Sequence, residues 1–205
     1  MLSRWKYEKY YIDRMNVNDI SYFVTPRQVG MSSIVKGYIF DWCYKNPNST
    51  CLFIDNERNT GHRFFNIYSY RDLGKEYGDL NSIIDRTTQH YILFYNKSKI
   101  YFENTVKIQD FVSYDVIIVD NIPRFEYTEH RLNSFMNNIS KVFYGGFKKI
   151  IIIGGIPNKK QELFNRLDNM LMGSDYKIHF NNKTVEELKN IEKLYRKEKI
   201  LSIFA

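Results

Sequence analysis

In this 205-residue chain, the segment whose residue types best suit ligand binding reads TPRQVGMSS at 25–33. It lies between an apolar run and a helical pattern. Backbone N–H groups at the positive end of a helix would face a ligand there, which suits a phosphate. A standard phosphate loop reads GxxxxGK[ST]; its lysine reaches the β- and γ-phosphates and its hydroxyl holds Mg²⁺. Gly30 and Ser32 match the second glycine and the hydroxyl, but Met31 occupies the lysine position. Thr25 replaces the first glycine, and an ordinary strand-to-helix turn fits the segment equally well.

A second candidate is Asp120, which ends the apolar run VIIVD at 116–120. This is the form of a Walker B strand, whose carboxylate holds the water shell of Mg²⁺. In hydrolases the next residue is normally Glu, which polarises the attacking water. Here it is Asn121, which cannot accept a proton. Apolar strands that end in Asp are also common elsewhere, so the pattern alone leaves both interpretations open.

A third candidate is the segment KKIIIIGGIPN at 148–158, an apolar run followed by small residues and a proline. In motors driven by nucleoside triphosphates, this place responds to the γ-phosphate and couples it to movement. Gly155 lies at this point of the segment. A core strand followed by a glycine turn is the alternative interpretation.

Apolar runs and helical periodicity together predict an α/β three-layer sandwich with a mostly parallel central sheet. Strands are expected at 20–25, 51–55, 91–95, 99–104, 116–120, 148–155 and 176–180. Helices are expected at 5–16, 32–45, 62–77, 127–142, 159–172 and 184–198. In such sheets ligands bind beyond the carboxyl ends of the strands, which is where Gly30, Asp120 and Gly155 are expected.

Composition narrows the class of protein. The formal net charge of +7 permits binding to nucleic acid or another polyanion without proving it. Cys43 and Cys51 cannot build a disulfide framework, and the four scattered histidines have no zinc spacing. No apolar run reaches the roughly 18 residues of a membrane span, and the charged N-terminus is not a secretory signal. We therefore expect a soluble, intracellular protein of one domain.

The three candidate segments, in this order, resemble the ATPase domain of tailed-phage terminase large subunits, which are DNA-packaging motors. PRQVG at 26–30 is similar to the family's RQxGK, and GGIPN at 154–158 to its TTPN-like coupling loop. YEKYYIDRM at 7–15 resembles the helix that carries the adenine-contacting motif. GYIFDWCYKNPNSTCLFID at 37–55 echoes AYxxWxxxxNPxxTxLxxA, and KLYRKEKILSIF at 193–204 resembles the segment that closes the domain.

The resemblance implies a P-loop NTPase-like fold that binds ATP and Mg²⁺. Its implied catalytic residues are Arg27 and Asp120; Glu126, or alternatively Glu129, is a catalytic candidate as a substitute for the missing carboxylate. Its implied nucleotide-binding residues are Tyr7 and Glu8 at the adenine; Arg27, Gln28, Gly30, Met31, Ser32 and Ser33 at the phosphates; and Gly155 in coupling. Ser32 and Asp120 would hold the metal.

The resemblance also implies partners and a location. These are double-stranded DNA, a homo-oligomeric ring, portal or other capsid proteins, and the cytoplasm of an infected host, with no membrane. Residues 1–205 would form a single ATPase domain without the family's nuclease domain. Lysines such as Lys148 and Lys149 could contact DNA phosphates, or they could be solvated ends of elements.

Two departures from the family pattern weigh against efficient hydrolysis. Met31 removes the charge that draws in the β- and γ-phosphates, and Asn121 removes the carboxylate that positions water. Arg27 could supply the missing charge and Glu126 the missing carboxylate. The alternatives are a catalytically inactive pseudo-ATPase with a structural, regulatory or DNA-binding role, and a helicase-like accessory domain.

Overall fold

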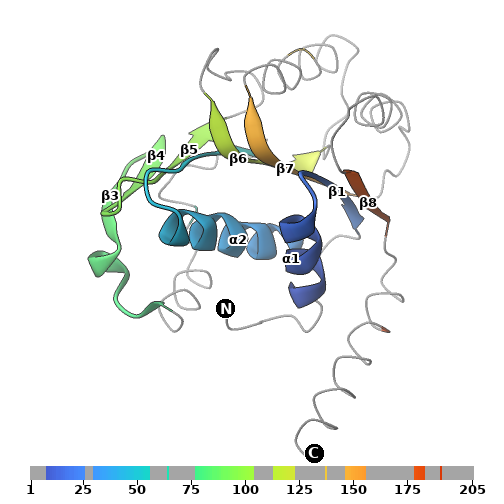
Figure 1. Cartoon of the computed structure of the whole chain (residues 1–205), viewed down its shortest axis with the longest axis horizontal. Coiled ribbons are helices and arrows are strands. Elements are labelled where there is room, and N and C mark those ends of the chain that lie inside the picture. The colour runs from blue at the N-terminus through green and yellow to red at the C-terminus, as the bar shows by residue number, and fades with distance from the viewer. Residues whose placement is uncertain are drawn as a thin grey trace, which may run out of the picture.

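The computed structural model describes residues 8–25, 30–55, 64, 77–103, 113–122, 137, 146–155, 178–182 and 190. Figure 1 shows these residues as one twisted sheet with two helices, α1 and α2, along one of its faces. The helices predicted at 62–77, 127–142, 159–172 and 184–198 lie outside the described residues, apart from isolated positions. No helix in the described part of the chain has the length and apolar character to cross a membrane.

Eight strands form the sheet within the described residues, and most of them are parallel. Their bounds are β1 Ile20–Thr25, β2 Thr50–Asp55, β3 Ile84–Thr87, β4 Tyr91–Phe94, β5 Lys99–Glu103, β6 Tyr114–Ile122, β7 Phe147–Gly155 and β8 Ile178–Asn182. Their order across the sheet is β3-β4-β5-β2-β6-β7-β1-β8. Neighbours from β5 to β8 are parallel, whereas β3 with β4 and β4 with β5 are antiparallel. The predicted α/β fold with a mostly parallel sheet is confirmed.

Parallel strands give the sheet two different edges. We call the side where β2, β6, β7 and β1 end the carboxyl edge, and the side where they begin the amino edge. Thr25 and Gly155 are register partners at the carboxyl edge, and so are Asp55 and Asp120. Residues 116–119 of β6 and 150–153 of β7 are apolar and buried, because helices or loops must cover both faces of a parallel sheet.

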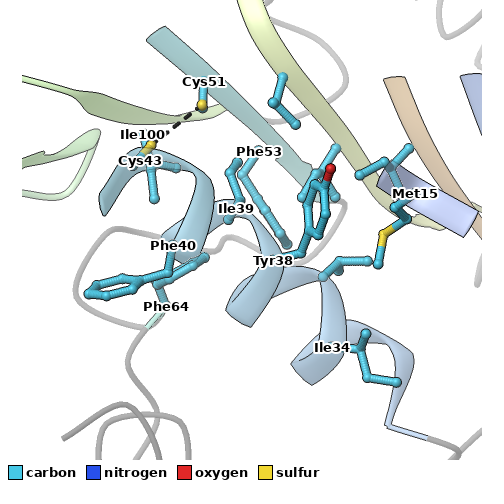
Figure 2. Packing of buried hydrophobic residues seen from close by; sticks show 14 of the residues in the cluster. Met15, Ile34, Tyr38, Ile39, Phe40, Cys43, Cys51, Phe53, Phe64 and Ile100 are labelled. Carbon is cyan, nitrogen blue, oxygen red and sulfur yellow. Dashed lines mark hydrogen bonds between the residues drawn. The ribbon is translucent and has the colours of Figure 1, made fainter. Parts of the chain in front are cut away.

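Two helices cover one face of the sheet: α1 (Glu8–Val17) and α2 (Met31–Lys45). Figure 2 shows Ile34, Tyr38 and Ile39 of α2 directed into the same cluster as Phe53 of β2. The helical spacing predicted this face, although Trp42 is only partly buried. A single 3₁₀ turn, η1 (Leu80–Ser82), precedes β3.

At the amino edge, α2 ends beside the start of β2. The buried Cys43 thiol donates to Cys51 Sγ at 3.4 Å, so this end of the helix lies over the first residues of the strand (Figure 2). Both cysteines are free thiols. A helix of 15 residues is about 22 Å long at 1.5 Å per residue, so α2 must begin at the carboxyl edge.

Lys149 fixes the other helix at the amino edge. Its ammonium donates to the carbonyl oxygens of Asn16 (2.9 Å) and Asn18 (3.0 Å), at the C-terminus of α1. A cation is favourable there because the last carbonyls of a helix have no intrahelical donors. Lys148 forms an ion pair with Asp115 at 2.7 Å. Both lysines therefore have protein partners at the amino edge.

Candidate functional site

The first turn of α2 begins at Gly30, whose backbone has φ 79° and ψ 12°. This left-handed conformation favours glycine, because a Cβ atom would strain it. The Gly30 carbonyl accepts hydrogen bonds from the amides of Ser33 and Ile34, both at 3.0 Å. The amides of Met31 and Ser32 come before the first of these bonds and have no acceptor within the helix. No side chain of the described residues caps the helix. The start of α2 therefore offers N–H donors and a positive dipole end at the carboxyl edge.

Met31 has a structural reason to be apolar. Its side chain is 4% exposed and belongs to the core cluster between α2 and the sheet. Ser32 and Ser33, which follow it, are only partly buried. Position 31 therefore faces the core, where a charged side chain would need a partner.

Asp120 lies near the end of β6 and is 2% exposed. Strand β7 separates β6 from β1, and all three are parallel. Since α2 follows β1 and begins at the same edge, Ser32 and Asp120 lie at one edge of the sheet. Their part in binding a metal stays a prediction.

The ladder between β6 and β7 is irregular beside Asp120. Val119 pairs with Ile152, but Ile122 pairs with Gly154, so β6 has one residue more than β7 in this interval. Such a bulge bends a strand and redirects its side chains, and bulges are frequent next to functional sites. Asn121, at the predicted position of the catalytic carboxylate, lies within the bulge.

Sequence reasoning missed Asp55 as a site residue. It ends β2, is 4% exposed, and is the register partner of Asp120 across the β2–β6 ladder. Residues two apart on a strand share a face, so Asp55 lies on the same face as Phe53, which packs under α2. The signal was present: CLFID has the same form as VIIVD, an apolar run that ends in Asp.

Lys36 is a second charged residue that sequence reasoning missed. It lies in the second turn of α2 and is buried. Its Nζ is 5.7 Å from the centroid of the Phe64 ring, and that ring packs edge-to-face on Phe53 at 5.8 Å. Among the described residues, Lys36 makes no ion pair.

Glu8, predicted to lie near the adenine, is buried at the start of α1. Only Asn18 and Asp19 separate α1 from β1, so the helix runs back along the strand. Tyr11 packs edge-to-face on Phe23 of β1 at 5.1 Å, as expected for a ring that packs against the sheet. Because Glu8 precedes Tyr11 by nearly one turn, it lies toward the carboxyl edge.

Several predicted site residues lie outside the described residues. These are Tyr7, Arg27, Gln28, Glu126 and Glu129. Gly155 is described by its backbone: it ends β7 beside Thr25 of β1. Gly155 therefore lies at the carboxyl edge, and its role in coupling stays a prediction.

The donors at this edge fit a hard divalent cation. Two buried carboxylates and a serine hydroxyl provide oxygen atoms, which Mg²⁺ prefers; it is typically held by one or two carboxylates together with substrate phosphates. Within the described residues, no group of three His, Cys, Asp or Glu side chains gathers as a complete metal cage would require. An ion at this edge would therefore need a further ligand, such as a phosphate.

Comparison with known proteins relates this fold to one group of structures. No protein-family model matches the sequence, and neither does any curated protein. The crystal structure of the bacteriophage HK97 large terminase does match: it covers 89% of this chain and 39% of that one, with a TM-score of 0.60 at 11% identity. This chain has the fold of part of a phage large terminase.

Two further structures show the same fold. The large terminase of a thermophilic bacteriophage, solved in complex with ADP, matches 90% of this chain with a TM-score of 0.54 at 11% identity. The Phi-29 viral genome packaging motor assembly matches 75% with a TM-score of 0.53 at 15% identity. The matches cover 45% and 50% of those chains, so this terminase-like chain spans half their length or less.

Proposed function

We propose that this chain is the nucleotide-binding ATPase domain of a motor that packages viral double-stranded DNA. One observation carries the proposal: the Gly30-capped start of α2 and the buried Asp120 lie at the same carboxyl edge. Backbone N–H groups suited to a phosphate and a carboxylate suited to Mg²⁺ thus lie at the same edge, although the segments that carry them are far apart in the sequence. The fold shared with large terminases supports the proposal.

In this proposal the phosphates bind the amides at the start of α2, with Ser33, Arg27 and Gln28 of the loop around them. A bound Mg²⁺ would supply positive charge that stabilises the phosphates. Ser32 and Asp120 orient that ion. Arg27 replaces the charge that Met31 lacks, because a guanidinium binds phosphate oxygens in pairs.

Other residues would bind the base, transfer a proton and report the state of the site. Glu8 lies toward the carboxyl edge at the start of α1, so it and the preceding Tyr7 are proposed to contact the adenine. Glu126 would accept the proton of the attacking water in place of Asn121. Gly155 ends the strand between β6 and β1, where a change at the phosphates would reach β7.

The proposed partners are double-stranded DNA, further copies in a ring, and a portal or other capsid protein in the infected cell. Lys148 and Lys149 are poor candidates for the DNA contact. Lys148 pairs with Asp115, and Lys149 is bonded to the end of α1. Basic residues elsewhere in the chain would supply it.

Calorimetric titration with ADP and Mg²⁺ tests the nucleotide site. The wild-type chain is expected to bind ADP, and Asp120→Asn to lose most of the Mg²⁺-dependent affinity. Asp85→Asn is the matched control, because Asp85 is an exposed aspartate on β3, which β4, β5 and β2 separate from β6. A folded wild-type chain that binds neither ADP nor ATP would contradict the assignment.

A pseudo-ATPase is the second candidate function, favoured by the burial of Met31 and by Asn121. The two candidates differ in turnover. Phosphate release that DNA stimulates, and that Arg27→Ala abolishes, excludes the inactive protein. Nucleotide binding without phosphate release, at any DNA concentration, excludes the motor.

A further inference from the structure

We propose that Cys43 and Cys51 are a reversible redox pair, which closes to a disulfide within the folded chain and then links the end of α2 to β2. The inference concerns the amino edge of the sheet and does not depend on the proposed nucleotide site. Two cysteines are too few for the disulfide framework of a small secreted protein, but they are enough for one reversible bond.

The two sulfur atoms are in contact. Cys43 lies in the last turn of α2 and Cys51 lies eight residues later in β2, with their Sγ atoms 3.4 Å apart (Figure 2). The Cys43 thiol donates its hydrogen bond to Cys51 Sγ, so the two side chains already point at each other. The sulfurs of a disulfide are about 2.0 Å apart, so the bond requires an approach of about 1.4 Å. Both residues are completely buried, so this approach occurs inside the packed layer between helix and sheet.

Hydrogen bonds from the β4–β5 hairpin hold the chain on both sides of the pair. Asn96 donates from Nδ2 to the Cys43 carbonyl at 2.8 Å, at the helix side. The Lys99 amide donates to the Ser49 carbonyl at 2.8 Å, just before the strand that carries Cys51. In an unfolded chain the two thiols must first be brought together, whereas the fold holds them together before they react. The folded chain should therefore favour the disulfide.

The reaction is thiol–disulfide exchange with a small disulfide such as oxidised glutathione. Burial, and then the hydrogen bond with Cys51, raises the pKa of Cys43 well above its usual range, so Cys51 reacts first. The Cys51 thiolate attacks one glutathione sulfur, a mixed disulfide forms, and one glutathione leaves as its thiolate. Cys43 then loses its proton, attacks Sγ of Cys51 and releases the second glutathione. The pair loses two electrons and two protons, and glutathione disulfide gains them as two thiols.

A structural zinc site explains the pair less well. Such a site usually has four ligands in a tetrahedral arrangement. In the part of the chain that the structure describes, no group of three His, Cys, Asp or Glu side chains surrounds the two sulfurs. The contact between the two thiols is thus better suited to a bond between them than to a shared metal.

The test is the equilibrium constant for the disulfide in mixtures of reduced and oxidised glutathione, approached from both the reduced and the oxidised chain. Equilibrium is measured because exchange at a buried pair must wait for local opening and is slow. Maleimide added in urea traps the remaining thiols, and mass spectrometry counts them. The constant is expected to be about tenfold or more larger for the native chain than for the chain in urea. The oxidised chain should then melt about 3 °C or more above the reduced chain.

Cys43→Ser and Cys51→Ser are the matched controls, because each keeps one thiol and cannot form the bond. Oxidised glutathione should not raise the melting temperature of either variant. If a buried hydroxyl prevents folding, Cys43→Ala and Cys51→Ala provide the same comparison. A native constant no larger than that in urea would overturn the proposal, and so would an oxidised chain that melts below the reduced one. Both results leave the assignment of the ADP site untouched, because no nucleotide is present in the experiment.

Discussion

The amino and carboxyl edges of the sheet both hold buried or half-buried polar side chains, but these side chains contact different things. At the amino edge several of them bond to the main chain. Ser98 Oγ donates to the Asn46 carbonyl at 2.7 Å, and Asn96 donates to the Cys43 carbonyl at 2.8 Å. At the carboxyl edge, Asp55 and Asp120 lie side by side in register.

This difference suggests that polar residues at the amino edge serve stability and those at the carboxyl edge serve ligand binding. A polar side chain that replaces a missing backbone partner stabilises the fold, since the carbonyl it bonds would otherwise be buried without a donor. Buried carboxylates at the ends of neighbouring strands are instead typical of a site that binds a ligand. We therefore expect substitutions at the amino edge to change stability alone, and substitutions at the carboxyl edge to change ligand binding.

The largest expected effect is the protection of the two thiols at the amino edge. Cys43 and Cys51 are completely buried. Burial, and then the neighbouring Cys51, raise the pKa of Cys43 well above its usual range, so the reactive thiolate is scarce. Iodoacetamide at pH 8 should label both thiols at least about a thousandfold more slowly in the native chain than in urea. Rapid native labelling would mean that this edge opens readily.

The next effect is at the carboxyl edge. Asp120→Asn should weaken Mg²⁺-dependent ADP binding roughly a hundredfold, because it removes a charged metal ligand. Its free energy of unfolding without metal should change less than this affinity does, because aspartate and asparagine have nearly the same volume. Calorimetry and urea denaturation measure the two quantities. A less stable variant with unchanged affinity would reverse the proposed roles of the edges.

A smaller effect is expected from Lys149→Met at the amino edge. The substitution keeps the length of the side chain but removes the donor to the Asn16 and Asn18 carbonyls. The free energy of unfolding should fall by about 1 to 2 kcal/mol, since the lysine is partly exposed. ADP affinity should stay within twofold of wild type. Lys148→Met, which removes an exposed ion pair, is the control and should cost less than about 1 kcal/mol.

The last expected effect is a change in pH dependence. Burial, followed by the charges of Glu103 and Tyr101, raises the pKa of Tyr114 to about 12. The unfolded tyrosine ionises near 10, so stability due to Tyr114 is present below pH 10 and is lost as the pH rises from 10 to 12. Tyr114→Phe should reduce this loss by up to about 1.4 kcal/mol per pH unit, measured by urea denaturation across that range.

Lys149 contributes the opposite sign in alkaline solution. Burial lowers its pKa below the usual value, despite the opposing charge of Asp19. The unfolded state then binds more protons just below pH 10.5, so this contribution to stability rises with pH. Lys149→Met should therefore remove a rise in stability just below pH 10.5, whereas Tyr114→Phe should remove a fall in stability between pH 10 and 12.

The sequence was sufficient for most of the described sheet. Runs such as ISYFVT and KKIIIIGG are continuous and apolar, and β1 and β7 form where they predict strands. Strand β3 was missed because its four residues, IDRT, hold two exposed charged residues in the middle. An antiparallel strand at the end of a sheet is defined by its neighbour β4, and a single-sequence pattern carries no information about that neighbour.

The candidate site was predicted only in part, for a similar reason. Asp120 and Gly30 lie in recognisable local patterns. Asp55 becomes relevant only through its register with Asp120, which depends on how β2 pairs with β6. Lysine is a residue type that usually lies on the solvated face of a helix, and only the packing of Lys36 against Phe64 shows that it is buried. Pairing and burial are properties of the folded chain.

Helix α1 is fixed on β1 at two points: Lys149 bonds to carbonyls at its C-terminus, and Tyr11 packs on Phe23. Its length alone then sets how far Glu8 reaches toward the opposite edge of the sheet. Removing one residue between Tyr11 and Val17 would draw Glu8 back by about 1.5 Å and turn it by about 100°. Insertions and deletions in this helix should therefore be far less tolerable than substitutions on its exposed side.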